Sequence, residues 1–180
     1  MLGNSKSAYG WLSRSLHWVI AATTLGLIGM GWWMMDLGYY DAWYYASRQW
    51  HEALGLAVWV LALFLAVWHL VNRPPETLTP KRWERLASAV AHKLLYAALL
   101  VLPAAGYLIE TADGSPLVLF DAITLPALGK LGDTARLAAE WVHAVGAYSL
   151  LALAAIHAAG ALKHHFIDRD RTLLRMLRGG

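Results

Sequence analysis

The sequence contains no cysteine and few charged residues. Only 15% of its 180 residues are Asp, Glu, Lys or Arg, whereas a water-soluble domain usually has about 25%. Without cysteine, thiolate nucleophiles, iron–sulfur clusters and cysteine-held metals are excluded. Apolar residues make up 58% of the chain, which excludes a disordered protein and argues against a single aqueous domain. This composition is typical of a membrane protein.

Uncharged segments recur four times along the chain. They are Ser15–Met35, Ala53–Asn72, Leu94–Ile109 and Trp141–Leu162, with 21, 20, 16 and 22 residues. The third segment extends toward the N-terminus as far as Leu86 if Lys93 is included. The ammonium group of this lysine can reach the membrane–water interface. About 20 helical residues cross the apolar layer of a membrane. The sequence predicts an all-α, integral membrane four-helix bundle, in which residues 1–180 form one domain with helices at 13–35, 48–71, 84–110 and 137–166.

Lysine and arginine are distributed unequally between the two ends of the predicted bundle. If both termini share one side, 12 of the 15 basic residues lie on that side. The other side has three, which are Arg48, Lys130 and Arg136. Because basic residues are retained on the cytoplasmic side, we expect both termini to be cytoplasmic. The surroundings are expected to be membrane lipid, and no nucleic-acid partner is expected.

Histidines lie within the spans at matched depths. His17 lies just inside the inner end of the first span, and His51 lies at the outer end of the second. The fourth span carries His143 near its outer end and His157 near its inner end. The two positions differ by 14 residues, which corresponds to a rotation about 40° short of four full helical turns. Both imidazoles therefore share one helix face and lie about 21 Å apart along the axis. Ionisable residues inside a bilayer are costly and are candidates for a functional site.

Two axial pairs follow from these depths, His17 with His157 and His51 with His143. Bis-histidine ligation of two b-type haems fits the way helix bundles build core sites, whereas zinc would need three or four ligands at one point. A glycine follows about one turn after three of these histidines, at Gly55, Gly146 and Gly160, which leaves room for a flat macrocycle. The alternative interpretation is ordinary close packing of membrane helices at the glycines, with interfacial histidines satisfied by water.

This argument does not decide the roles of two further histidines. His69 lies 18 residues, about five turns, beyond His51 and therefore points to the same face. His92 lies at the inner end of the third span. Either is an alternative to His17 as the partner of His157. The interpretation that we favour for both is hydrogen bonding to a haem propionate or to a quinone.

Five segments carry a resemblance to a known family. They are YGWLSRSLHW, HEALG, NRPP, HKLLYAALLVLPAAGYL and WVHAVGAYSLLALAAIHAAGALKHHFIDRDRTLLRML. Together, and over nearly the whole chain, they resemble the bacterial cytochrome b561 family. The resemblance implies a di-haem cytochrome of the bacterial inner (plasma) membrane that exchanges electrons with quinone, with haem ligands at His17, His51, His143 and His157. The chain departs from the family at Leu65 and His69, where arginines are frequent.

One branch of the family, superoxide oxidase, passes electrons from periplasmic superoxide to ubiquinone. The outer side of this chain carries eight acidic residues, Asp36, Asp41, Glu52, Glu110, Asp113, Asp121, Asp133 and Glu140, against the three basic ones. An enzyme that steers an anion benefits from a positive field, so these charges argue against superoxide unless the three basic residues form a local patch. We expect a quinone-linked oxidoreductase, with superoxide as a candidate donor. The alternative is a haem-bearing membrane anchor that relays electrons for a dehydrogenase or hydrogenase partner.

A quinone site is expected at the inner end of the fourth span. His164 follows His157 by seven residues and so continues the same face about 10 Å further. Imidazole can deliver protons near neutral pH, and Lys163 beside it can stabilise negative charge. The sequence therefore predicts that His164 and Lys163 bind ubiquinone or another quinone. The alternative is that these residues and the arginines after them hold the tail against anionic headgroups.

Overall fold

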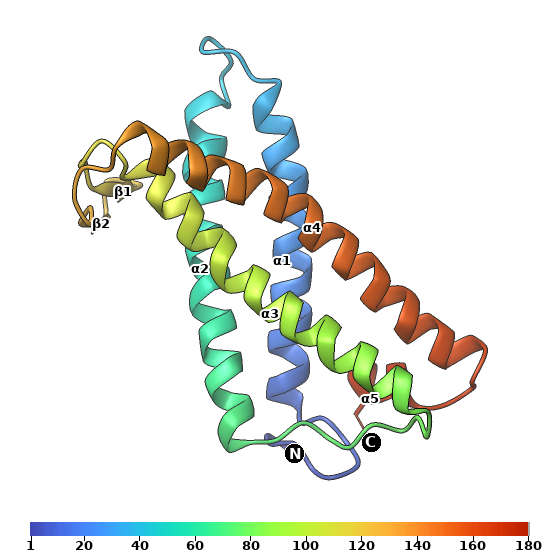
Figure 1. Ribbon diagram of the computed structural model, residues 1–180. Coiled ribbons are helices and arrows are strands. Elements are labelled where there is room, and N and C mark those ends of the chain that lie inside the picture. The colour runs from blue at the N-terminus through green and yellow to red at the C-terminus, as the bar shows by residue number, and fades with distance from the viewer. Residues whose placement is uncertain (180) are drawn as a thin grey trace.

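Four long helices dominate the computed structural model, which describes residues 1–179; the last residue of the predicted domain, Gly180, lies outside the described residues (Figure 1). The helices are α1 (Trp11–Met35), α2 (Tyr44–Val71), α3 (Arg82–Glu110) and α4 (Asp133–Phe166). Each is long and apolar enough to cross a membrane, which confirms the predicted number of helices of that kind. All four end where the sequence predicts, but each begins two to four residues earlier. Charged first turns, as at Asp133, are compatible with a helix that extends beyond the apolar layer.

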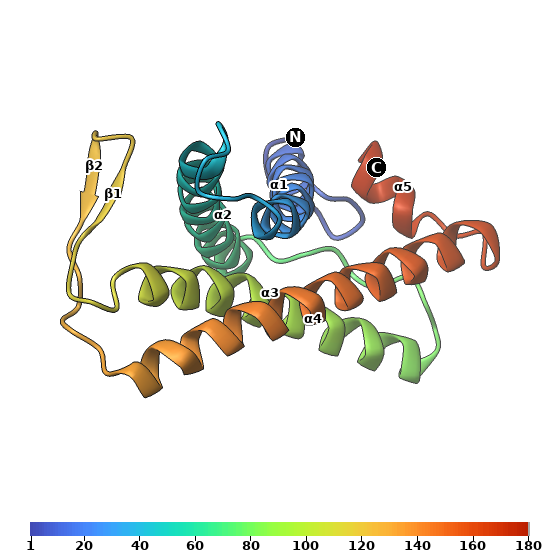
Figure 2. The same cartoon turned by 90° about the horizontal axis from the view of Figure 1, so that it is seen from above.

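The four helices form two pairs. Figure 1 shows α1 beside α2, and Figure 2 shows α3 and α4 in a second layer that runs across the first pair. The chain ends lie together at one end of the bundle, and the loop after α3 lies at the other (Figure 1). This agrees with an even number of crossings. The side of the membrane that the termini face stays a prediction.

Two short elements make the fold mostly helical rather than all-α. Strands β1 (Leu117–Leu119) and β2 (Ile123–Leu125) pair antiparallel. Phe120 and Asp121, between them, adopt positive φ angles of 51° and 55°, as in the turn type that matches the twist of a hairpin. The turn lacks the Asn-Gly or Gly-Gly signal and the strands are short, so the sequence pattern did not predict them. A short helix, α5 (Thr172–Leu177), ends the described chain.

Few large side chains are buried inside the bundle. The buried core between α1 and α2 consists of Leu16, Ile20, Val58 and Leu65. Many large apolar side chains, such as Leu63 and Phe64 on α2, are exposed on the isolated chain. Apolar side chains that point outward are expected where lipid rather than water surrounds the helices.

Candidate functional site

His51 of α2 and His143 of α4 face each other toward the hairpin end of the bundle. Their ring centroids are 6.2 Å apart, and the ring planes make an angle of 64°. His143 Nδ1 lies 2.9 Å from the carbonyl oxygen of Leu102 on α3. Because a carbonyl only accepts, the proton must be on Nδ1, which leaves the lone pair of Nε2 free. Metal-ligating histidines usually donate their second ring nitrogen in this way.

A glycine on α3 sets the position of the His143 ring. A Cβ atom at Gly106 would lie 3.2 Å from His143 Cε1 and 3.3 Å from its Nδ1, which is closer than most real contacts. On the opposite side of the pair, a Cβ atom at Gly31 would lie 3.5 Å from His51 Cε1. Sequence reasoning missed Gly106 and Leu102, because both come from a helix remote in sequence from His143 and no local periodicity indicates them.

Three histidines gather toward the other end of the bundle. His17 of α1 and His157 of α4 have ring centroids 6.1 Å apart, with an angle of 58° between their planes. His92 of α3 lies closer to His157, at 4.9 Å, and its Nδ1 donates to the Ser88 carbonyl oxygen at 2.7 Å. The structure therefore places two candidate partners beside His157.

The ring separations test whether these pairs fit a shared haem iron. A metal–nitrogen bond of about 2 Å and a further distance of about 1.1 Å to the ring centre place two axial imidazoles about 6.2 Å apart across one ion. The pairs His51–His143 and His17–His157, at 6.2 Å and 6.1 Å, fit this separation. His92 and His157, at 4.9 Å, are too close for an ion between them in that arrangement. The geometry favours His17 over His92.

The glycines one turn after the histidines do not all leave open space. A Cβ atom at Gly55 or Gly160 would meet nothing within 4 Å, as expected if room is kept beside His51 and His157. At Gly146 it would lie 2.8 Å from Leu102 Cδ2. The prediction that Gly146 leaves room for a macrocycle is therefore wrong, since Leu102 fills that space and the glycine allows α3 and α4 to pack closely.

His69 is engaged by α3 rather than by another histidine. Its Nδ1 lies 2.9 Å from the hydroxyl oxygen of Tyr96, and its Nε2 is buried without a hydrogen-bond partner in the described part of the chain. A buried nitrogen without a partner is unusual. This nitrogen is therefore available for a polar group that is not part of the polypeptide.

Lys163 and His164, the predicted quinone site, lie among carboxylates. Lys163 Nζ donates to Glu84 Oε1 at 2.6 Å and to Asp168 Oδ2 at 2.5 Å. His164 Nδ1 lies 2.8 Å from Asp170 Oδ2 and 3.1 Å from Asp168 Oδ2. The charge of Lys163 is therefore offset by two carboxylates. Asp168 lies four residues after His164 and could have been found by spacing, whereas Glu84 belongs to α3 and could not.

The carboxylate of Asp170 is stabilised in its charged form. Burial raises its pKa, but hydrogen bonds from Thr172 and His164 outweigh that effect and hold the pKa below its ordinary range. The backbone N–H of Thr172 donates to Asp170 Oδ1 at 2.7 Å. Asp170 thus connects the end of α4 to the start of α5.

Two of the three basic residues at the hairpin end are paired with carboxylates. Arg48 Nε donates to Glu52 Oε1 at 2.9 Å, and its Nη2 donates to Glu110. Arg136 Nε contacts Glu140 Oε1 at 3.0 Å. Among the described residues, Lys130 forms no ion pair. The local positive patch that would steer an anion is therefore largely offset.

A cavity of about 330 Å³ lies over this end of the bundle, between α2, α3 and the hairpin. Its polar lining includes Arg48 with three carboxylates, those of Glu52, Glu110 and Asp113. Hydrogen bonds from Ser115 hold the pKa of Asp113 below its ordinary range, so this carboxylate is charged at neutral pH. The cavity is acidic, and it lies within one helical turn of His51.

The four apolar helices carry two pairs of imidazoles, and in each pair the ring separation fits two ligands of one metal ion. Because no cysteine is present to attach haem covalently, this arrangement defines a membrane cytochrome of the b type. The family model of prokaryotic cytochrome b561 matches residues 8–179. The chain belongs to this family, whose members bind haem b and transfer electrons in membranes.

Individual relatives cover nearly the whole chain. Cytochrome b561 homolog 2 of Escherichia coli (strain K12) is 37% identical over 97% of this chain and 93% of the relative. Cytochrome b561 homolog 1 of the same organism is 29% identical, over 90% and 92% of the two chains. A probable superoxide oxidase, CybB of Yersinia pestis, is also 29% identical, over 94% and 95%. These relatives agree with the resemblance found in the sequence.

Proposed function

We propose that the protein is a di-haem cytochrome that carries electrons across the bacterial inner membrane between an outer donor and quinone. One haem b would be held by His51 and His143, and the other by His17 and His157. The observation that carries the proposal is the pair of ring separations, 6.2 Å and 6.1 Å. When bound, haem supplies one-electron redox chemistry, while the protein supplies ligation, burial and orientation.

The residues around the two sites have separate roles in this proposal. The Leu102 carbonyl fixes the tautomer of His143 and so leaves Nε2 as the nitrogen that would bind a haem iron. The open space beside Gly55 and Gly160 is available to the macrocycle. Because His143 and His157 both lie on α4, this single helix fixes the spacing of the two sites, about 21 Å along its axis.

Quinone is proposed to react at the inner end of α4, beside His164. Reduction of a quinone takes up protons as well as electrons, and His164 is hydrogen-bonded to Asp170, a carboxylate outside the membrane-spanning helices. The pair offers a route for protons from water to the imidazole. Lys163 has a smaller role than the sequence suggested, because Glu84 and Asp168 already offset its charge.

A single substitution tests this quinone site. His164→Ala should slow quinone reduction by roughly tenfold or more, because general acid catalysis contributes about 10²-fold or more, and should leave both haem spectra intact. His165→Ala is the matched control, since this neighbouring histidine contacts Phe166 and should change little. Unchanged turnover in His164→Ala would place the quinone elsewhere, with His69 or His92 as the next candidate.

Superoxide is the outer donor that the name of one relative suggests. The ion pairs of Arg48 and Arg136, together with the acidic residues of this face, predict that superoxide is not steered electrostatically. The rate of haem reduction by superoxide should therefore stay well below the diffusion limit and rise with added salt, as screening weakens repulsion. A fast rate that falls with salt would contradict this account of the outer face.

The alternative, an anchor that relays electrons for a dehydrogenase or hydrogenase partner, predicts a different result. In the absence of the partner, neither superoxide nor another small electron donor would then reduce the haems of the purified protein quickly. Adding the partner would restore haem reduction. Haem reduction by a small donor without any partner favours the first proposal.

A further inference from the structure

A buried arginine in the C-terminal tail forms no ion pair with any residue that the structure describes. Arg175 of α5 is 6% exposed. Its Nη1 donates to the Glu76 carbonyl oxygen at 2.9 Å, but Nε and Nη2 are buried without an acceptor among the described residues. A buried guanidinium without a counter-charge is strongly unfavourable. An acceptor beyond the described residues is therefore expected here.

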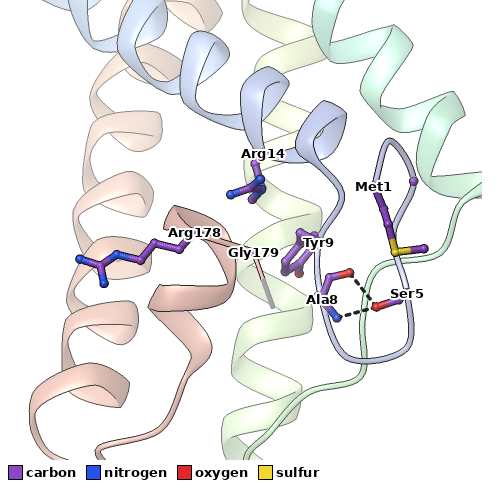
Figure 3. A pocket seen from close by; sticks show the side chains of 8 residues that line it. Met1, Ser5, Ala8, Tyr9, Arg14, Arg178 and Gly179 are labelled. Atoms are coloured by element: carbon purple, nitrogen blue, oxygen red, sulfur yellow. Dashed lines mark hydrogen bonds between the residues drawn. The ribbon is translucent and has the colours of Figure 1, made fainter.

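A second arginine nearby has the same deficit. Arg14 of α1 donates through Nη1 to the Leu177 carbonyl oxygen at 3.2 Å, which ties it to α5, while its Nε is buried and unpartnered in the described chain. Arg14 lines a cavity of about 170 Å³ together with Tyr9 (Figure 3). Arg178 also lines this cavity, but its side chain points away from Tyr9 (Figure 3). The guanidinium nitrogens that are buried without an acceptor among the described residues are therefore Nε of Arg14 and Nε and Nη2 of Arg175.

The aromatic ring beside them does not supply the missing charge. Arg175 Cζ lies 6.0 Å from the centre of the Tyr9 ring. Burial raises the pKa of Tyr9, although Arg175 opposes the effect, so the hydroxyl stays neutral at physiological pH. Within residues 1–179, neither arginine forms an ion pair with a carboxylate.

The tail docks beside the inner histidine pair. Arg14 precedes His17 by three residues on α1, which places the two on the same face, one turn apart. The indole N–H of Trp18 donates to the Met176 carbonyl oxygen at 3.2 Å, and the Trp18 ring contacts His17 edge-on at 5.1 Å between centroids. Arg14 therefore lies one turn from His17, and α5, which carries Arg175, contacts α1 beside it.

We propose that Arg14 and Arg175 hold a propionate carboxylate of the haem bound by His17 and His157. This rests on the proposed function. A guanidinium fork matches a carboxylate with two parallel hydrogen bonds. A lipid phosphate shares this chemistry, but the unpartnered N–H groups are buried, and Arg14 lies on the His17 face. The haem carboxylate is thus the ligand that these positions favour.

Redox titration of the inner haem tests the proposal. The His51→Ala background retains only that haem, so its midpoint potential can be followed alone in nanodiscs of zwitterionic lipid. A nearby cation favours the reduced, less positive haem, so Arg175→Gln should lower the midpoint potential. Arg175→Lys, which keeps the charge, should have a midpoint potential close to that of the protein with Arg175. Arg171→Gln, an exposed arginine at the start of the same helix, is the control and should change nothing.

Arg14→Gln gives an independent result if the tail fails to dock in the Arg175 variants. An unchanged midpoint potential in both Arg14→Gln and Arg175→Gln would overturn the inference. A midpoint potential that responds to these substitutions only when phosphatidylglycerol is present would also overturn it, because the arginines would then hold a lipid phosphate. Failure of the proposed function looks different, since the unsubstituted protein would then lack a second haem.

Discussion

At the scale of the residue, the proposed function assigns haem ligation to four imidazoles. Replacing His51 or His143 by Ala should remove the outer haem, because a single imidazole remains at that level. His17→Ala or His157→Ala should likewise remove the inner haem. The haem-to-protein ratio should fall from two to one in each case. Full haem loading after any one of these changes would refute the assignment.

The remaining membrane histidines provide the controls for this prediction. His69→Ala and His92→Ala should retain both haems, since His69 contacts Tyr96 and His92 lies only 4.9 Å from His157. If His92→Ala loses the inner haem while His17→Ala keeps it, the ligand pair at the inner level must be reassigned to His92 and His157.

Some residues of the candidate site could be predicted from the sequence and others could not. Depth and helical spacing identified His143 and His157 as candidates, because both lie on one helix, and their role as haem ligands stays a prediction. The contacts of His143 with Leu102 and Gly106 required the packing of α3 on α4, which no local pattern encodes. For the same reason, Glu84, the partner of Lys163 from α3, was not predicted.

At the scale of the element, the packing of α3 against α4 positions the outer site. Gly106→Val should displace the His143 ring, because even a Cβ atom there would lie 3.2 Å from Cε1. The expected result is a lower occupancy or a shifted visible spectrum of the outer haem, with the inner haem unchanged. Gly29→Val is the matched control, since a Cβ atom at Gly29 meets nothing within 4 Å. Equal effects of the two substitutions would argue against this role of Gly106.

The attachment of α5 should depend on pH through Asp170. Its pKa is depressed in the folded protein, so its contribution to stability is present above the unfolded pKa of about 3.9 and is lost as pH falls through the lower, folded value. The protection of the amides of residues 172–177 against hydrogen exchange, relative to the intrinsic rate at each pH, should therefore be high at neutral pH and fall below about pH 4. Asp170→Asn should exchange faster at pH 7 and lack this acid transition. A transition that persists in Asp170→Asn would assign it to another group.

Element ends were more predictable than element beginnings. The helices end at Met35, Val71, Glu110 and Phe166, as the sequence pattern predicts. They begin earlier than expected, because polar first turns such as those at Tyr44 and Asp133 continue the helix outside the apolar layer. The hairpin and α5 were missed because three-residue strands and a six-residue helix have too little periodicity to be detected.

At the scale of the whole molecule, the charge distribution predicts the orientation in the membrane. Because 12 of the 15 basic residues lie at the end that carries the termini, a reporter fused after Gly180 should be cytoplasmic and one inserted at Gly114 should be periplasmic. A periplasmic C-terminus would reverse the inner and outer assignments of both haem sites. The number of spans was predictable from hydropathy, whereas the crossing of the two helix pairs (Figure 2) was not, since it depends on contacts between helices.

The central claim is that one chain binds two haem b groups at two levels of the membrane. The most direct measurement is the haem content of the purified, unsubstituted protein, obtained as haem b per chain from reduced-minus-oxidised spectra calibrated against protein concentration. The two histidine pairs, at 6.1 Å and 6.2 Å, predict two haems per chain. A value of one haem per chain in fully loaded protein would contradict the account.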